Sequence, residues 1–198
     1  MTQALLFDLD GTLIDSSDDL TRALNAAFAE HGLGALSREQ VEPLIGQGAQ
    51  ALIERALQTS GQRHLVADSD LLLASFSQRS HEIYDLGRSS TRAHRFALET
   101  LRELKSMGVA LALVTNKGRE LSVKALRKIN AEPFLRQSSA ATPVLGASRI
   151  RCLCSELASS WGSSYPAFAW WVIRSTMSER RAPPEFRSGA CRMDIGKA

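Results

Sequence analysis

Apolar residues follow two kinds of pattern along this chain, and together the patterns predict an α/β fold. Short uninterrupted apolar runs occupy residues 4–7 and 109–114. A continuous run of this length is typical of a strand that is buried on both faces, as in a parallel sheet. Elsewhere apolar residues recur every three or four positions, which is the spacing of an amphipathic helix. The sequence therefore predicts parallel strands separated by helices.

The segment between the two predicted strands contains helical patterns and no convincing strand. Ser16 or Ser17 can cap a first helix, and Ser37 begins a capping box for a second. Pro43 must then lie near the end of the second helix or kink it. Further helices are predicted at about residues 49–59, 68–85, 96–107 and 119–130.

Two acidic residues stand directly after the first predicted strand. Side chains two positions apart on a strand point the same way, so Asp8 and Asp10 emerge together where the strand ends. Ligands of open α/β sheets bind at this edge. Gly11 permits a tight turn and a close approach of the backbone to a ligand. Two aligned carboxylates beside a turn with free N–H groups can hold a divalent cation and a phosphate.

The stretch Asp8-x-Asp10-Gly-Thr-Leu-x-Asp-Ser resembles the first motif of the haloacid dehalogenase-like phosphohydrolases, and it is most similar to phosphoglycolate phosphatases. The resemblance implies a Mg²⁺-dependent hydrolase in which Asp8 attacks phosphorus to form an aspartyl-phosphate. Asp10 would protonate the leaving oxygen and then activate water. The resemblance also implies Mg²⁺ on Asp8 and on the backbone oxygen of Asp10, with Gly11 and Thr12 beside the phosphate.

Two further segments are similar to other parts of that family. The second predicted strand ends in Thr115-Asn116. The resemblance implies that Thr115 gives its hydroxyl, and Asn116 its backbone or side chain, to the phosphoryl group. Gly46-Gln47-Gly48 looks like the cap loop that reaches over the active site and helps to choose the substrate. A plain turn between two helices is the alternative interpretation of this loop.

The resemblance also predicts how the chain is divided. The fold would be a Rossmann-like, doubly wound parallel sheet with an inserted, all-helical cap. Residues 1–14 and 96–136 would form a partial core, residues 15–86 the cap, and residues 87–95 the linker that returns to the core. Residues 137–198 would form an atypical tail and are a candidate for disorder, so we expect the core to be incomplete.

The composition changes abruptly near residue 137. All three Cys and all three Trp follow this point, and seven of the eight basic residues there are Arg. The rest of the family pattern is missing: no Lys occurs between Lys128 and Lys197, and no acidic pair completes a Mg²⁺ site. We hypothesise that the tail is translated from a shifted reading frame or otherwise replaces the true C-terminal third. The other frames of the underlying DNA test this, and it fails if they lack a Lys-Pro and a Gly-Asp-x-x-x-Asp pattern.

Other features of the tail predict little chemistry. Cys152, Cys154 and Cys191 lack the spacing of a zinc site, so we interpret them as free thiols. The apolar run 168–173 is a candidate strand and also an aggregation-prone segment.

The missing elements have two expected consequences. In the family the acid-pair strand lies beside the first strand, so its loss would leave the first strand as an apolar edge. Each missing catalytic group could cost roughly 3–4 kcal/mol of transition-state stabilisation, or ~10²–10³ in rate. We therefore expect this chain to be poorly active or inactive.

The substrate implied by the cap resemblance is 2-phosphoglycolate. The alternatives are a phosphatase or mutase of another phosphorylated metabolite, such as a sugar phosphate, and an inactive remnant. The net charge of +3 comes from the tail, because residues 1–137 hold 16 basic and 17 acidic residues. We therefore expect no nucleic-acid partner. Without a visible membrane span or signal peptide, we expect a cytoplasmic monomer or homodimer that binds a small phosphorylated metabolite.

Overall fold

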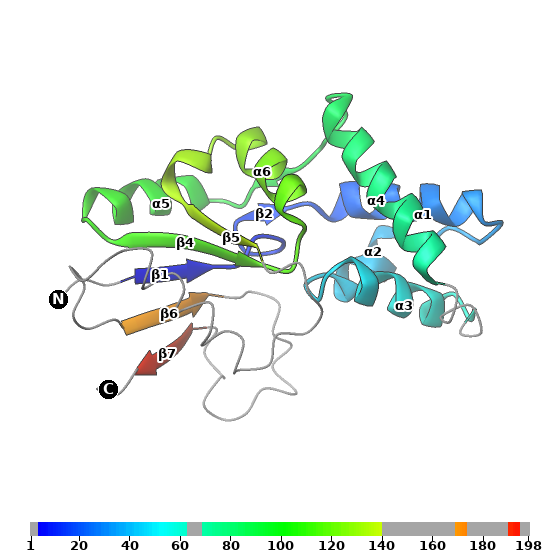
Figure 1. Cartoon of the computed structure of the whole chain (residues 1–198), viewed down its shortest axis with the longest axis horizontal. Coiled ribbons are helices and arrows are strands. Elements are labelled where there is room, and N and C mark those ends of the chain that lie inside the picture. Colours follow the sequence, from blue (N-terminus) through cyan, green and yellow to red (C-terminus); the bar gives the residue numbers. More distant parts are fainter. Residues whose placement is uncertain (1–3, 63–68, 140–168, 174–189, 195–198) are drawn as a thin grey trace.

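The described part of the chain contains one five-stranded sheet, and this confirms the predicted α/β fold. The computed structural model describes residues 4–62, 69–139, 169–173 and 190–194. The strands lie in the order β5-β4-β1-β6-β7 (Figure 1). Neighbouring strands run parallel, except that β6 and β7 are antiparallel. The bounds of the strands are β1 (Ala4–Phe7), β4 (Ala110–Thr115), β5 (Arg136–Ser139), β6 (Ala169–Ile173) and β7 (Ala190–Asp194).

The register between β1 and β4 brings the ends of these two strands together. Ala4 pairs with Ala110, and Phe7 pairs with Leu113. Asp8 is the next residue after β1, and Thr115 is the last residue of β4. The side chains that follow both strands therefore meet at the same edge of the sheet.

The expectation that β1 would be an exposed edge is wrong. β6 pairs in parallel with β1 along its whole length, with Ala4 opposite Trp170 and Phe7 opposite Ile173. β6 confirms the candidate strand of the tail, and its backbone provides the hydrogen-bonding partner that β1 would otherwise lack. Cys191 lies in β7, while Cys152 and Cys154 lie outside the described residues.

Four helices and one 3-10 turn gather beside the sheet, toward the right in Figure 1. They bury a hydrophobic cluster of their own, which includes the fully buried side chains of Phe28, Ile53 and Leu57. No helix among the described residues is long and apolar enough to cross a membrane. The bounds of these elements are α1 (Ser17–Glu30), α2 (Arg38–Val41), η1 (Glu42–Leu44), α3 (Ala49–Thr59) and α4 (Ser69–Asp85).

Local sequence explains where α2 begins and ends. The backbone N–H of Gln40 donates to the Ser37 hydroxyl, and the N–H of Ser37 donates to Oε1 of Gln40, which confirms the predicted capping box. Pro43 lies in η1, directly after the helix, as its missing N–H group requires.

A second hydrophobic cluster fastens the remaining helices to the sheet. Leu101 of α5 and Leu126 of α6 are fully buried in it together with Leu113 of β4. Fully burying a side chain of this size contributes about 1.5–3 kcal/mol. The packing of these helices against the sheet therefore stabilises the edge that carries Asp8 and Thr115. The bounds are α5 (Ala97–Ser106), α6 (Arg119–Lys128) and η3 (Glu132–Phe134).

A small two-stranded ribbon, which the sequence did not predict, joins the helices to the sheet. β2 (Ile14–Asp15) pairs antiparallel with β3 (Arg92–Ala93), so the segment taken for a plain linker contains a strand. Asp15 also forms ion pairs with Arg92 at 3.0 Å and with Arg38 at 3.1 Å. Burial acts to raise the pKa of Asp15, but the hydrogen bonds and the arginine charges lower it to about 2.

Asp19 connects α1 to the returning chain. Its carboxylate accepts hydrogen bonds from the hydroxyls of Ser89, Ser90 and Thr91 at 2.6 to 2.7 Å. It also accepts from the N–H groups of Ser90 and Thr91 at 2.9 and 3.2 Å. Burial acts to raise the pKa of Asp19, but these donors outweigh it and hold the pKa far below its usual range. This buried carboxylate therefore fixes the segment where the chain leaves the helices.

Candidate active site

Asp8 and Thr115 lie together at the carboxyl end of the sheet. Asp8 follows β1 and is only 6% exposed, and Thr115 ends β4 and is only 4% exposed. The N–H of Leu9 donates to Oδ1 of Asp8 at 2.8 Å and orients this carboxylate. The backbone N–H of Lys117 donates to the Thr115 hydroxyl oxygen at 3.2 Å, a bond that uses a lone pair of this oxygen and not the hydroxyl hydrogen. The two side chains line the same cavity.

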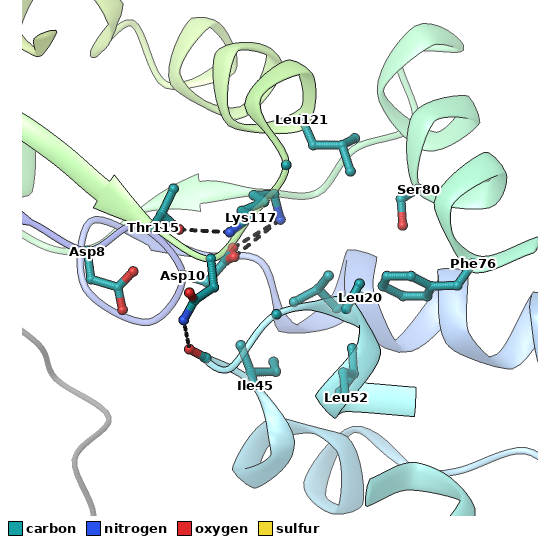
Figure 2. A pocket seen from close by; sticks show the side chains of 15 residues that line it. Asp8, Asp10, Leu20, Ile45, Leu52, Phe76, Ser80, Thr115, Lys117 and Leu121 are labelled. Carbon is teal, nitrogen blue, oxygen red and sulfur yellow. Dashed lines mark hydrogen bonds and ion pairs between the residues drawn. The ribbon is translucent and has the colours of Figure 1, made fainter. Parts of the chain in front are cut away.

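The carboxylate of Asp10 is held by two side chains. The Ser16 hydroxyl donates to Oδ1 of Asp10 at 2.5 Å. The Lys117 ammonium lies 3.1 Å from Oδ1 and 3.4 Å from Oδ2 (Figure 2). Burial acts to lower the pKa of Lys117, but the attraction of Asp10 and nearby Tyr84 outweighs it and raises the pKa. The site therefore contains a buried, positively charged lysine.

Lys117 is the site residue that sequence reasoning missed. The family resemblance implies a phosphate-binding lysine in the C-terminal third of the chain, where no Lys precedes Lys197. Lys117 follows Thr115-Asn116 at the turn from β4 into α6, which is where a charged side chain enters the carboxyl edge of the sheet. Its position directly after a strand end was the signal that could have revealed it.

Asn116 connects this edge of the sheet to the predicted cap loop. Its side-chain Nδ2 donates to the backbone oxygen of Gly46 at 2.9 Å. Gly48 has a φ of +89°, and a Cβ atom there would lie 3.5 Å from the backbone oxygen of Asn116. Gly46 and Gly48 both line the cavity, whereas Gln47 is exposed and does not line it. The positive φ of Gly48, rather than a lack of space around it, is what favours glycine at this position.

The turn after Asp10 differs from expectation, because its N–H groups are not free. The N–H of Gly11 donates to the backbone oxygen of Ile14 at 2.8 Å, and the N–H of Thr12 donates to the oxygen of Leu9 at 3.2 Å. Neither Gly11 nor Thr12 lines the cavity. The loop folds back on itself and uses these donors to close its own turn.

The cavity lies between the sheet edge and the helices and has a volume of about 70 Å³. Its walls differ in chemistry (Figure 2). The polar wall is formed by side chains that follow the strands, namely Asp8, Asp10, Thr115, Asn116 and Lys117. The opposite wall is mainly apolar and includes Leu20, Ile45, Ala49, Leu52 and Phe76, while Leu121 of α6 adds an apolar side chain near Lys117. One hydroxyl group, from Ser80 of α4, belongs to this second wall.

The described residues provide few metal ligands. They contain no group of three or more His, Cys, Asp or Glu side chains that could hold a metal ion. Among the described residues that line the cavity, Asp8 and Asp10 are the ones that supply carboxylates. Such a donor set suits Mg²⁺, which is commonly bound by one or two carboxylates together with water and substrate phosphate.

Comparison with known protein families agrees with this geometry. Residues 5–147 match the model of a family described as haloacid dehalogenase-like hydrolase. The chain belongs to this family. The match includes Asp8, Asp10, Thr115 and Lys117, and it extends somewhat past residue 137, where the composition changes.

Curated haloacid dehalogenase-like relatives of this chain include enzymes named phosphoglycolate phosphatase. The protein from Caulobacter vibrioides is 35% identical over 132 residues, which are 66% of this chain and 54% of that protein. The protein from Aliivibrio fischeri is 36% identical over 116 residues, which are 57% of this chain and 50% of that protein. The chain thus spans about half the length of the curated relatives it matches.

A solved structure has a similar arrangement over most of this chain. The crystal structure of a predicted phosphoglycolate phosphatase from Haemophilus somnus has a TM-score of 0.65 and 25% identity to this chain. The comparison covers 79% of this chain and 72% of that one. This likeness supports an α/β core with associated helices.

Proposed function

We propose that this chain is a phosphomonoester hydrolase that uses an aspartate nucleophile. The observation that carries the proposal is the pairing of two buried carboxylates, Asp8 and Asp10, with Thr115 and Lys117 in one cavity. A nucleophile, a proton carrier, a hydroxyl donor and a cation are the groups that phosphoryl transfer to a carboxylate requires.

In the proposed reaction an oxygen of the Asp8 carboxylate attacks phosphorus. The bond from phosphorus to the leaving oxygen breaks, and an aspartyl-phosphate forms. The Asp10 carboxyl group gives its proton to the leaving oxygen, and the resulting carboxylate then takes a proton from the water that attacks phosphorus and breaks its bond to Asp8. Orthophosphate leaves and Asp8 is restored. Ser16 and Lys117 hold the Asp10 carboxylate in place during both steps.

The phosphoryl oxygens would be bound by the Thr115 hydroxyl and by the backbone of Asn116. The side-chain nitrogen of Asn116 already donates to Gly46, so we assign the phosphate contact to its backbone. Mg²⁺ would be held by Asp8 and by the backbone oxygen of Asp10. When bound, it would neutralise phosphate charge as a Lewis acid.

We propose 2-phosphoglycolate as the substrate, since curated relatives at about 35% identity are named phosphoglycolate phosphatases. Orthophosphate release in the presence of Mg²⁺ should be measured with 2-phosphoglycolate and with a hexose phosphate at equal concentrations. The proposal predicts the higher kcat/KM for 2-phosphoglycolate. Equal or better turnover of the hexose phosphate would favour the alternative, a sugar-phosphate phosphatase or mutase.

We also propose that turnover is weak. No acid pair and no Lys before Lys197 follow residue 137, so this part of the chain lacks the second acidic ligands and the phosphate lysine that family resemblance implies. Lys117 is a cation in the site, but it is engaged with Asp10. A chain that binds orthophosphate without hydrolysing any phosphomonoester would instead be an inactive remnant.

A further inference from the structure

The wall of the cavity opposite the carboxylates contains a hydroxyl group with no evident structural role. Ser80 of α4 is 6% exposed, and its Oγ has no hydrogen-bond partner among the described residues. Buried side-chain hydroxyls nearly always have a partner, and an unsatisfied one lowers stability. A molecule bound in the cavity is therefore the candidate hydrogen-bond partner of this hydroxyl.

The surroundings of Ser80 restrict what that occupant can be. Figure 2 shows its side chain directed from α4 into the space beside Lys117, Leu121 and Phe76. The helical side of the cavity contributes no charged side chain among the described lining residues. Leu20, Leu52 and Phe76 line the cavity and offer no hydrogen bond. Among the described lining residues of this wall, Ser80 is therefore the one with a side-chain hydrogen-bonding group.

The size of the cavity restricts the occupant further. Its volume is about 70 Å³, whereas pockets for drug-sized ligands usually measure about 300–1,000 Å³. If the phosphoryl group lies against Asp8 and Thr115, the rest of the cavity suits a leaving group of a few atoms with an apolar middle and a polar end.

We infer that Ser80 is a specificity-determining residue, whose hydroxyl donates to an acceptor oxygen at the far end of a short leaving group. This inference rests on the proposed function for the location of the phosphoryl group. The substrate class it selects is a phosphorylated short hydroxy acid, in which one methylene separates the ester oxygen from a carboxylate. Lys117 is the one cation among the described lining residues that faces the same cavity.

The test compares two ligands that differ only at the end far from the phosphoryl group. 2-Phosphoglycolate carries the carboxylate, and ethyl phosphate has a methyl group in its place. The affinity for each is measured by calorimetry with Mg²⁺ present, in Asp8→Asn protein so that neither ligand is consumed. Ser80→Ala is added to this background and compared with Ser77→Ala, a matched change at an exposed serine of the same helix.

Ser80→Ala should lower the preference for 2-phosphoglycolate over ethyl phosphate on the order of tenfold, the effect of losing one hydrogen bond to a charged group. Ser77→Ala should leave the preference unchanged. The thermal midpoint of Ser80→Ala should not fall, because no hydrogen bond within the described protein is lost.

An unchanged preference, no binding of either ligand, or a lowered midpoint would each overturn the inference. The proposed function is tested separately by hydrolysis in protein that retains Asp8. If 2-phosphoglycolate is hydrolysed but Ser80→Ala keeps the preference, the proposed hydrolase function is supported and the role of Ser80 is contradicted. If Ser80→Ala lowers the preference but no phosphomonoester is hydrolysed, the role of Ser80 is supported and the hydrolase function is contradicted.

Discussion

The ammonium of Lys117 lies 3.1 Å from Oδ1 of Asp10, and the two side chains are only 7% and 12% exposed. The pair joins the turn after β4 to the turn after β1, so it connects the two strand ends that form the polar wall of the cavity. A buried charge without a partner is costly, and each member of the pair therefore depends on the other. The ion pair thus holds the positive charge of Lys117 in the site, although the C-terminal third lacks the phosphate-binding lysine that the family resemblance implies.

Replacing Lys117 with Met should be strongly destabilising. The substitution leaves the Asp10 carboxylate buried with Ser16 as its remaining side-chain donor among the described residues. Breaking a buried ion pair in this way costs roughly 3–5 kcal/mol in the free energy of unfolding. Urea denaturation at pH 7 measures the change.

Lys124→Met is the matched control for Lys117→Met. Lys124 forms an ion pair with Asp85, but these side chains are 29% and 58% exposed. An exposed pair contributes about 0–1 kcal/mol. Similar losses of stability in the two variants would contradict the view that the Lys117–Asp10 pair is buried and mutually dependent.

Asp19 should make the fold sensitive to acid. The pKa of Asp15 is lowered to about 2 and that of Asp19 is lowered as well, in both cases by donors that outweigh the effect of burial. An unfolded Asp titrates near pH 3.9. Both carboxylates therefore stabilise the fold above about pH 4, and this contribution is lost as the pH falls from about 4 toward 2.

Asp19→Asn should lower the free energy of unfolding at pH 7 by about 2 kcal/mol, since it removes charge-assisted hydrogen bonds to residues 89–91. In this variant the free energy of unfolding should also decrease less steeply as the pH falls below 4. Asp18→Asn serves as the control, because Asp18 is 46% exposed and its ion pair with Arg38 is worth less than about 1 kcal/mol. Urea denaturation at pH 7, 4 and 3 would show whether the two variants differ; parallel curves would contradict the role of Asp19.

Asn116→Ala should weaken substrate binding through the cap loop. The change removes the hydrogen bond from Nδ2 to the oxygen of Gly46 at 2.9 Å, so the loop would lose a contact that holds it at the cavity. We expect KM to rise several-fold with a smaller change in kcat, as one neutral hydrogen bond contributes about 1 kcal/mol. Initial rates with 2-phosphoglycolate measure both quantities.

Asn25→Ala is a suitable comparison for Asn116→Ala. The Asn25 side chain donates to the backbone oxygen of Leu36 at 2.8 Å and accepts from its N–H at 2.9 Å, and it does not line the cavity. This variant should lose stability and keep its KM. If both variants shift KM equally, the effect of Asn116 would be a general loss of stability.

Much of the fold could be predicted from local patterns. The strand that precedes Asp8, the strand that ends in Thr115 and the helices between them have clear hydrophobic spacing, because each buries one face or both in a core. The β2–β3 ribbon was not predicted, because two-residue strands are too short to show a period. The pairing of β6 with β1 was missed for another reason: strand pairing depends on contacts far apart in the sequence.

The site was predicted in part. Asp8, Asp10 and Thr115 come together as expected, because parallel strands place their carboxyl ends at one edge. Lys117 was not predicted: its position after the end of β4 indicated a place at this edge, but its ion pair with Asp10 joins residues 107 positions apart in the chain. The N–H groups of Gly11 and Thr12 were expected to be free but donate within the turn, because such hydrogen bonds cannot be read from residue types. The place of these two residues beside the phosphate stays a prediction.

The central claim is that Asp8 is the nucleophile of a phosphomonoester hydrolase. Orthophosphate release from 2-phosphoglycolate, measured with Mg²⁺ for the intact chain and for Asp8→Asn, tests it most directly. We expect slow but measurable release by the intact chain and a loss of at least ~10³-fold in the variant, since an amide cannot replace the attacking carboxylate. Release that survives Asp8→Asn undiminished would contradict it.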